Sequence, residues 1–183
     1  MRDKLPTISF DIDGVINNYP LCFINYVNSL LKTDFVSNDE IKKLEDYKYL
    51  KHSYRLSDYK YNVEVDDEIK KLISEIYSEF QIKIFTSRPF HNYGDMFKNT
   101  KLWLEKNNIK FDGLFSKNFE IFDKANVLIH IDDEINHIKP LLDSKKTQFI
   151  VLEEGLDDFN NVHFVKNKIY IKDKIHQILN TIL

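Results

Sequence analysis

Four short runs of apolar residues constrain this chain more than any other feature of its sequence. They span residues 7–10, 82–85, 127–131 and 148–152, and a weaker fifth run spans 113–116. The four are rich in β-branched or aromatic residues and almost free of charge, which is typical of strands buried on both faces of a parallel sheet. The sequence therefore predicts a parallel sheet with both faces covered.

Amphipathic segments alternate with these runs. Apolar residues at positions 69, 72, 73, 76, 77 and 80 form one stripe of a helix, and Asp66 and Asp67 stand where its N-cap belongs. Further helices are expected over about 93–106, about 118–125, from 134 to the proline at 140, and around 171–182. Strands that alternate with helices indicate a doubly wound, Rossmann-like α/β fold with helices on both faces of the sheet.

Residues 15–64 interrupt this alternation, because they separate the first two strands by far more than one crossover helix needs. A helix is expected over 21–31. Ser37 and Glu40 have the spacing of a capping box, and a tract dense in Tyr and Lys follows over 48–62. We interpret residues 15–64 as an inserted, mostly helical subdomain, and residues 1–14 and 65–183 as one α/β core.

The charge balance and the cysteine count exclude several classes of function. Lys and Arg number 26 and Asp and Glu 29, for a net charge of −3, so no basic excess is present to bind a nucleic acid polymer. Cys22 is the single cysteine, which excludes an intramolecular disulfide and a Cys-based metal cluster. No run approaches the roughly 20 apolar residues of a membrane span, and the first residues lack the apolar region of a signal peptide. We therefore expect a cytoplasmic protein that binds neither membranes nor nucleic acid polymers; no pattern specifies an oligomeric state.

Polar residues follow the predicted strands at their carboxyl ends, where open α/β sheets bind ligands. In chain order they are Asp11 and Asp13, then Thr86, Ser87 and Arg88, then Lys117, and then Asp132 and Asp133. Crowded carboxylates recruit a cation or shift their pKa values, and a set of oxygen ligands suits Mg²⁺. With Mg²⁺ bound, a phosphate dianion can enter, and the lysine, hydroxyl and amide groups then complete an anion site.

In this order and at these strand ends, the residues resemble the four signature motifs of the haloacid dehalogenase (HAD) superfamily. The matching positions are DIDGV at 11–15, Thr86, Lys117 and the pair Asp132-Asp133. The resemblance covers residues 7–133 and implies a phosphoric monoester hydrolase.

The resemblance also implies a role for each matching residue. Asp11 would be the nucleophile, and Asp13 would act first as general acid and then as general base. Mg²⁺ would be held by Asp11, the main-chain carbonyl of Asp13 and Asp132, with Asp133 orienting the groups around it. Thr86 would bind the phosphate, and Lys117 would neutralise its charge. An acid two residues after the nucleophile favours ester hydrolysis over dehalogenation or phosphonate cleavage.

The insertion occupies the position of the family's type 1 cap, which closes over small substrates. Residues 100–109 read T-x-x-W-L-x-x-N-x-I and resemble small bacterial HAD phosphatases, some nucleotidase-like and others from surface-sugar pathways. The expected partner is therefore a small-molecule phosphate ester. It is either a sugar or amino-alcohol phosphate of capsule or surface polysaccharide precursor synthesis or, alternatively, a 5′-nucleotide.

Several residues keep two interpretations. Lys117 opens a helix 15 residues before Asp132, and Lys124 lies near the far end of that helix; we favour Lys117 as the motif lysine. Arg88 either touches substrate or pairs with a carboxylate, and His130 is expected in the core. In the inserted tract, a group of residues either contacts the leaving group or forms a solvated face: His52, Tyr54, Arg55, Tyr59 and Lys60.

Two other classes of function remain as alternatives. Signalling domains that accept a phosphoryl group also combine Asp, Ser or Thr, and Lys on a parallel sheet, but their paired acids come early, whereas here the pair comes late. A non-catalytic binding module of the same fold is the second alternative, although each expected catalytic residue type is present.

Overall fold

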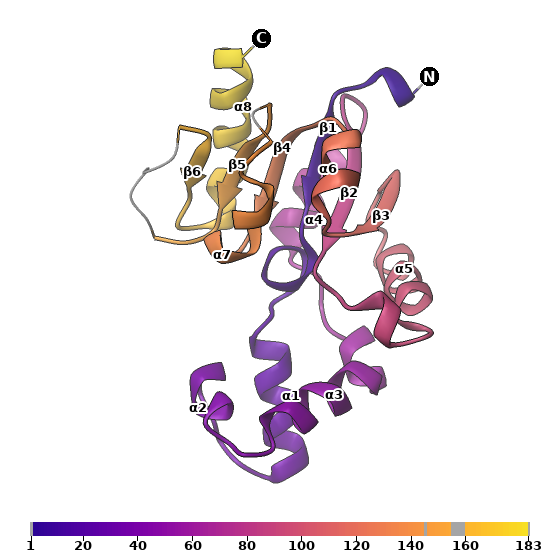
Figure 1. Ribbon diagram of the computed structural model, residues 1–183, viewed down its shortest axis with the longest axis vertical. Helices are drawn as coiled ribbons and strands as arrows, with labels where there is room; N and C mark the ends of the chain where they lie inside the picture. The colour runs from indigo at the N-terminus through magenta and orange to yellow at the C-terminus, as the bar shows by residue number, and fades with distance from the viewer. Residues whose placement is uncertain (1, 145, 155–159, 183) are drawn as a thin grey trace.

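The computed structural model describes residues 2–144, 146–154 and 160–182. Within these residues, parallel strands form one six-stranded sheet in the order β3-β2-β1-β4-β5-β6 (Figure 1). The strands are β1 (Thr7–Phe10), β2 (Gln81–Thr86), β3 (Gly113–Ser116), β4 (Val127–Asp132), β5 (Gln148–Val151) and β6 (Val162–Phe164). The prediction of a doubly wound, Rossmann-like α/β fold is confirmed.

The winding of the chain places β1 and β4 side by side at the point where the strand order reverses. From β1 the chain moves outward to β2 and β3, then returns to β4 and moves outward on the other side. Phe10 is in register with Ile131, and the amide of Asp11 donates to the carbonyl of Ile131 at 2.9 Å. Because β1 and β4 are adjacent, the acid that follows β1 and the acid that ends β4 become neighbours. Open α/β sheets bind their ligands at such a switch point.

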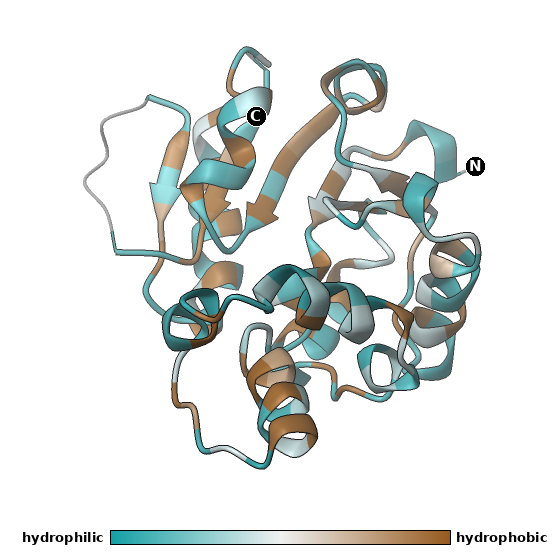
Figure 2. Cartoon of the chain, turned by 60° about the horizontal axis from the view of Figure 1, so that its bottom comes forward, coloured by the Kyte–Doolittle hydropathy of each residue, from teal (hydrophilic) through white to brown (hydrophobic). Residues whose placement is uncertain are grey.

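The two faces of the sheet carry separate hydrophobic clusters. Ile8, Ile129 and Ile131 pack in the same cluster as apolar residues of α4 (Asp67–Ile76) and α8 (Ile171–Ile182). Phe85 and Phe149 pack in another with residues of α6 (Phe119–Lys124) and α7 (Ile135–Ile138). The strands are mostly brown in Figure 2, with pale or teal stretches at their polar residues, while the helices mix brown and teal. Burial on both faces is what the unbroken apolar runs require.

The bounds of two core helices can be compared with those predicted from the sequence. The side chain of Asp66 accepts from the amide of Ile69 at 3.1 Å and starts α4 as predicted. This helix ends at Ile76, earlier than the apolar stripe suggested. α5 (Met96–Lys106) begins later than residue 93, because Phe90–Asn92 forms a short 3₁₀ turn and Tyr93 is extended. None of the described helices is long and apolar enough to cross a bilayer.

The inserted segment, defined here as residues 15–64, adds no strand to the sheet. It contains α1 (Leu21–Leu31), α2 (Asn38–Lys42), α3 (Tyr47–Leu56) and a 3₁₀ turn (Asp58–Tyr61). Its helices lie together beyond the carboxyl ends of the strands (Figure 1). The predicted capping box is present, because Ser37 Oγ accepts from the amide of Glu40 at 3.3 Å and the Glu40 carboxylate accepts from the amide of Ser37 at 3.1 Å.

The chain leaves the core for this segment and returns from it at one place. The amide of Asp66 donates to the carbonyl of Ile16 at 2.8 Å, which joins the outgoing and returning passages. Lys168 Nζ donates to the carbonyl of Val15 at 2.8 Å and to the Asp66 carboxylate at 3.0 Å. A lysine from the C-terminal part of the chain therefore contacts both the outgoing and the returning passage.

Candidate functional site

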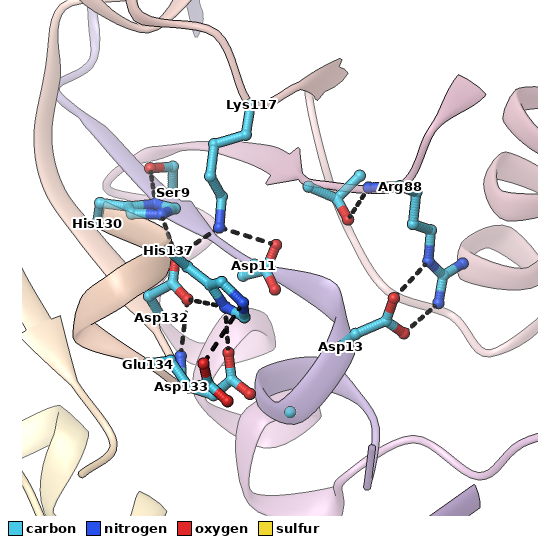
Figure 3. A network of polar contacts seen from close by, with 12 residues as sticks. Ser9, Asp11, Asp13, Arg88, Lys117, His130, Asp132, Asp133, Glu134 and His137 are labelled. Atoms are coloured by element: carbon cyan, nitrogen blue, oxygen red, sulfur yellow. Dashed lines mark hydrogen bonds and ion pairs between the residues drawn. The ribbon is translucent and has the colours of Figure 1, made fainter. Parts of the chain in front are cut away.

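One buried ammonium group lies between two carboxylates from neighbouring strands. Lys117, which follows β3, places Nζ 2.6 Å from Asp132 Oδ2 and 3.3 Å from Asp11 Oδ1 (Figure 3). Asp11 follows β1 and Asp132 ends β4. Lys124 is exposed at the end of α6. Of the two candidate lysines, the structure therefore brings Lys117 to the acids and leaves Lys124 outside.

Asp11 has an unusual environment for a carboxylate. Its Oδ1 is buried and accepts no hydrogen bond, because the contact with Lys117 lacks hydrogen-bond geometry. Burial raises the pKa of Asp11 to about 8, with the negative charge of Asp132 adding to the effect and Lys117 opposing it. A buried acceptor without a partner is costly, so this oxygen fits a group that brings positive charge.

A chain of hydrogen bonds holds Asp132 from behind. His130 Nε2 lies 3.1 Å from Asp132 Oδ2, and His130 Nδ1 lies 2.8 Å from Ser9 Oγ. Burial lowers the pKa of His130 despite the neighbouring carboxylate, so the imidazole is neutral. Because a carboxylate only accepts, Nε2–H donates to Asp132 and the Ser9 hydroxyl donates to Nδ1. His130 is in the core as predicted, and it also orients an acid of the site.

Asp133 packs directly over the main chain that follows Asp11. A Cβ atom at Gly14 would lie 2.1 Å from Asp133 Oδ2, and Gly14 has a φ of +90°. This explains the glycine of the DIDGV motif, since the turn needs both a positive φ and an absent side chain. His137 Nδ1 lies 3.2 Å from Asp133 Oδ1.

The acids at this edge fit a hard divalent cation. Ligand atoms of Asp132, Asp133 and His137 all lie within 4.8 Å of one another, and Asp11 follows the neighbouring strand with an Oδ1 that accepts no hydrogen bond. Carboxylate oxygens predominate in this set, which suits Mg²⁺ better than it suits a softer metal.

Asp13 belongs to a second group of charges, visible to the right in Figure 3. Arg88 donates to it twice, from Nη2 to Oδ1 at 2.7 Å and from Nε to Oδ2 at 3.1 Å, and also donates to Thr100 Oγ1 at 3.1 Å. Lys60 of the inserted segment lies 3.4 Å from Asp13 Oδ2. Burial would raise the pKa of Asp13, but Arg88 and Lys60 hold it well below its ordinary value. Of the two interpretations of Arg88, the geometry favours pairing with a carboxylate.

The end of β2 supplies the predicted hydroxyl groups. Thr86 is buried, its Oγ1 accepts from the amide of Arg88 at 3.3 Å, and its carbonyl accepts from the amide of Lys117 at 2.8 Å. Ser87 is exposed and lines the same cavity as Asp11. The structure thus brings both hydroxyl groups beside the acids.

A cavity of about 180 Å³ separates the strand ends from the inserted segment. Its core side is formed by Asp11, Asp13, Thr86, Ser87, Arg88, Pro89 and His137, and its other side by Tyr19, Lys51, Tyr54, Arg55 and Lys60. Within the predicted Tyr- and Lys-rich group, His52 and Tyr59 are outside this lining and are exposed.

Comparison with known proteins identifies the fold. No protein-family model matches the sequence, and no curated protein matches it. A HAD hydrolase from Bacillus subtilis, described as bound to magnesium, matches with a TM-score of 0.67 at 14% identity, over 96% of this chain and 99% of that one. The chain has the haloacid dehalogenase-like fold. A HAD-like hydrolase from Streptococcus pneumoniae (TM-score 0.61, 16% identity, 96% and 100% of the two chains) and a family IA HAD hydrolase from Entamoeba histolytica (0.59, 18%, 96% and 100%) match similarly.

Within this HAD-like fold, sequence reasoning missed several residues of the site. Lys51, Tyr19 and His137 line the cavity without having been singled out, and Thr100 holds Arg88. One signal for Lys51 was available, because it precedes Arg55 by four residues and so shares a helix face with it.

Proposed function

We propose that this chain is an Mg²⁺-dependent phosphatase that hydrolyses a small phosphomonoester through a phosphorylated Asp11. The position of Lys117 carries the proposal, since its ammonium lies between Asp11 and Asp132 at the switch point of the sheet. The HAD-like fold, which the chain shares with several hydrolases, supports hydrolytic chemistry. We also propose that the inserted segment serves as the cap of this site.

Asp11 is positioned for attack on a phosphate placed in the cavity. The phosphate would accept hydrogen bonds at the Thr86-Ser87 turn and lie near the Lys117 ammonium. Asp11, Asp132 and the main-chain carbonyl of Asp13 would hold Mg²⁺, with Asp133 orienting the groups around it. When bound, that ion would supply the charge that offsets repulsion between carboxylates and a phosphate dianion.

The reaction divides into two balanced steps. In the first, an Asp11 oxygen bonds to phosphorus, the ester P–O bond breaks, and Asp13 gives its proton to the departing alcohol. In the second, water bonds to phosphorus, Asp13 takes the proton of that water, and the bond from Asp11 to phosphorus breaks. Arg88 and Lys60 favour the ionised Asp13 of the second step, while the charge of an arriving phosphate raises the pKa of Asp13 toward the acid form of the first.

The test is phosphate release from a panel of small phosphate esters. Asp11→Asn keeps the shape of the side chain but removes the nucleophile, and we expect phosphate release to disappear. Asp123→Asn, at an exposed position of α6, is the matched control and should behave as the unaltered protein. Chelation by EDTA should abolish release and added Mg²⁺ should restore it; full activity of Asp11→Asn would end the proposal.

A further inference from the structure

Two cationic side chains of the inserted segment face the cavity without an acidic partner. Lys51 and Arg55 are half-buried, lie one turn apart on α3 and both line the cavity that reaches Asp11. Among the described residues, no carboxylate oxygen lies within 4.0 Å of either charged group. Partly buried charges are costly unless an opposite charge accompanies them, so this pair requires a counter-charge.

Aromatic rings account for the position of these cations but do not neutralise them. Lys51 donates to the hydroxyl of Tyr19, and its Nζ lies 4.5 Å from the centre of the Tyr19 ring and 4.8 Å from that of Phe23. The guanidinium of Arg55 lies 5.8 Å from the ring centre of Tyr93. Burial, with the charge of Arg55 in addition, lowers the pKa of Lys51 to about 8, which leaves Lys51 mostly charged at neutral pH.

The carboxylates that line the cavity are already matched with other cations. Asp13 is paired with Arg88 and Lys60, and Asp11 lies against Lys117. A phosphate bound at the strand ends would lie beside these paired groups of the core. Lys51 and Arg55 lie on the opposite side of the cavity, so they would face the organic part of the substrate, which departs as the alcohol.

We propose that Lys51 and Arg55 bind a second anionic group, a carboxylate or another phosphate, on the organic part of the phosphomonoester. This inference rests on the proposed function and narrows it to small esters with negative charge at both ends. A guanidinium presents paired donors to carboxylate or phosphate oxygens, and the neighbouring ammonium adds a further donor. The cavity of about 180 Å³ limits the carbon chain between the two charges to a short one.

The test compares esters that differ only in the second charge. 3-Phosphoglycerate is paired with glycerol 3-phosphate, and 1,3-propanediol bisphosphate with 3-hydroxypropyl phosphate, so the two arms separate carboxylate from phosphate recognition. In at least one pair, we expect kcat/KM to be about tenfold or more higher for the ester that carries the second anionic group. Loss of a charge-assisted hydrogen bond typically has an effect of this size.

Variants then assign the preference to these residues. Arg55→Gln should bring the ratio of kcat/KM values close to one, and Arg55→Lys should retain part of the preference. Lys48→Gln is the matched control, because Lys48 is an exposed residue of the same helix outside the cavity, and its ratio should equal that of the unaltered protein. Equal kcat/KM values for both members of each pair, or an unchanged ratio in Arg55→Gln, would overturn the inference.

A binding measurement separates this inference from the proposed function. In Asp11→Asn, calorimetry should show tighter binding of 3-phosphoglycerate, or of the bisphosphate, than of the partner ester. The preference should disappear in Asp11→Asn/Arg55→Gln. If no ester is hydrolysed but this preference is present, the phosphatase proposal fails and anion binding by α3 stands; if esters are hydrolysed without any preference, the reverse holds.

Discussion

Gly14→Ala should destabilise the fold strongly, because Gly14 meets two separate requirements at once. Its φ of +90° is a conformation that side chains disfavour, and an added Cβ would lie 2.1 Å from Asp133 Oδ2. Ordinary contact begins at about 3.4 Å, so Asp133 would have to move away. Gly94 provides the matched control, since nothing lies within 4 Å of a Cβ added there and its φ is not positive.

The cost can be divided into a backbone part and a packing part. A residue with a side chain at positive φ costs about 1–2 kcal/mol, less the roughly 0.4–1 kcal/mol that alanine gains by restricting the unfolded chain. Forcing atoms into an occupied space costs typically about 1–3 kcal/mol more. Gly14→Ala should therefore lower the free energy of unfolding by about 1–5 kcal/mol, while Gly94→Ala should leave it unchanged or raise it by up to about 1 kcal/mol.

Urea unfolding of a double-mutant cycle measures both parts. In an Asp133→Gly background the carboxylate and the Cβ atom, which would lie 2.7 Å from the added Cβ, are both absent, so Gly14→Ala should cost little more than the backbone part, about 1 kcal/mol. The same cost in both backgrounds would refute the contact between Gly14 and Asp133. A cost no larger than that of Gly94→Ala would refute the whole argument.

Three further results are expected. Lys117→Met should reduce phosphate release by about 10²-fold or more, because one cation serves two acids, whereas Lys124→Met should match the unaltered protein in the same assay. Ser9→Ala leaves a buried imidazole nitrogen without its donor and should lower the free energy of unfolding by about 1–3 kcal/mol in urea; an unchanged midpoint would contradict the hydrogen-bond chain. The hydrogen bond from Arg2 lowers the pKa of Asp112 below 3.8, so its stabilisation is complete above that pH and is lost as pH falls through the lower folded value. The free energy of unfolding should therefore fall less for Asp112→Asn than for the unaltered protein when the pH is lowered from above 3.8 to below it.

Local sequence pattern was sufficient to locate most strands and the polar residues at their ends. The order of the strands was not predicted. Strand composition follows from burial on both faces of the sheet, and the carboxyl ends of parallel strands meet at one edge. Asp11 and Asp132 are thereby brought to one edge, although 121 residues separate them in the sequence. β6 was not predicted, because it has only three residues, two of them half-exposed, and such a strand is defined by its neighbour rather than by its own pattern.

Pairings between distant polar residues could not be predicted in the same way. Arg88 lies 75 residues from Asp13, and Lys60 lies 47 residues from it. Arg88 stands at a strand end, where its pairing with a carboxylate was one of two expectations. Lys60 is an ordinary basic residue in its local sequence, and only the packing of the inserted segment against the sheet brings it to the same carboxylate. The burial of Asp11 Oδ1 without a hydrogen-bond donor is likewise a property of the assembled fold.

The contacts of Lys168 have a mechanical consequence. Because Val15 and Asp66 are held by one ammonium, the outgoing and returning passages cannot slide apart independently. A movement of the inserted segment as a whole would turn about this junction, where the Asp66 amide also bonds to the Ile16 carbonyl, and would displace the three cations that the segment contributes to the cavity together. Opening would withdraw Lys60 from Asp13 at the same moment that it carries Lys51 and Arg55 away from a departing alcohol.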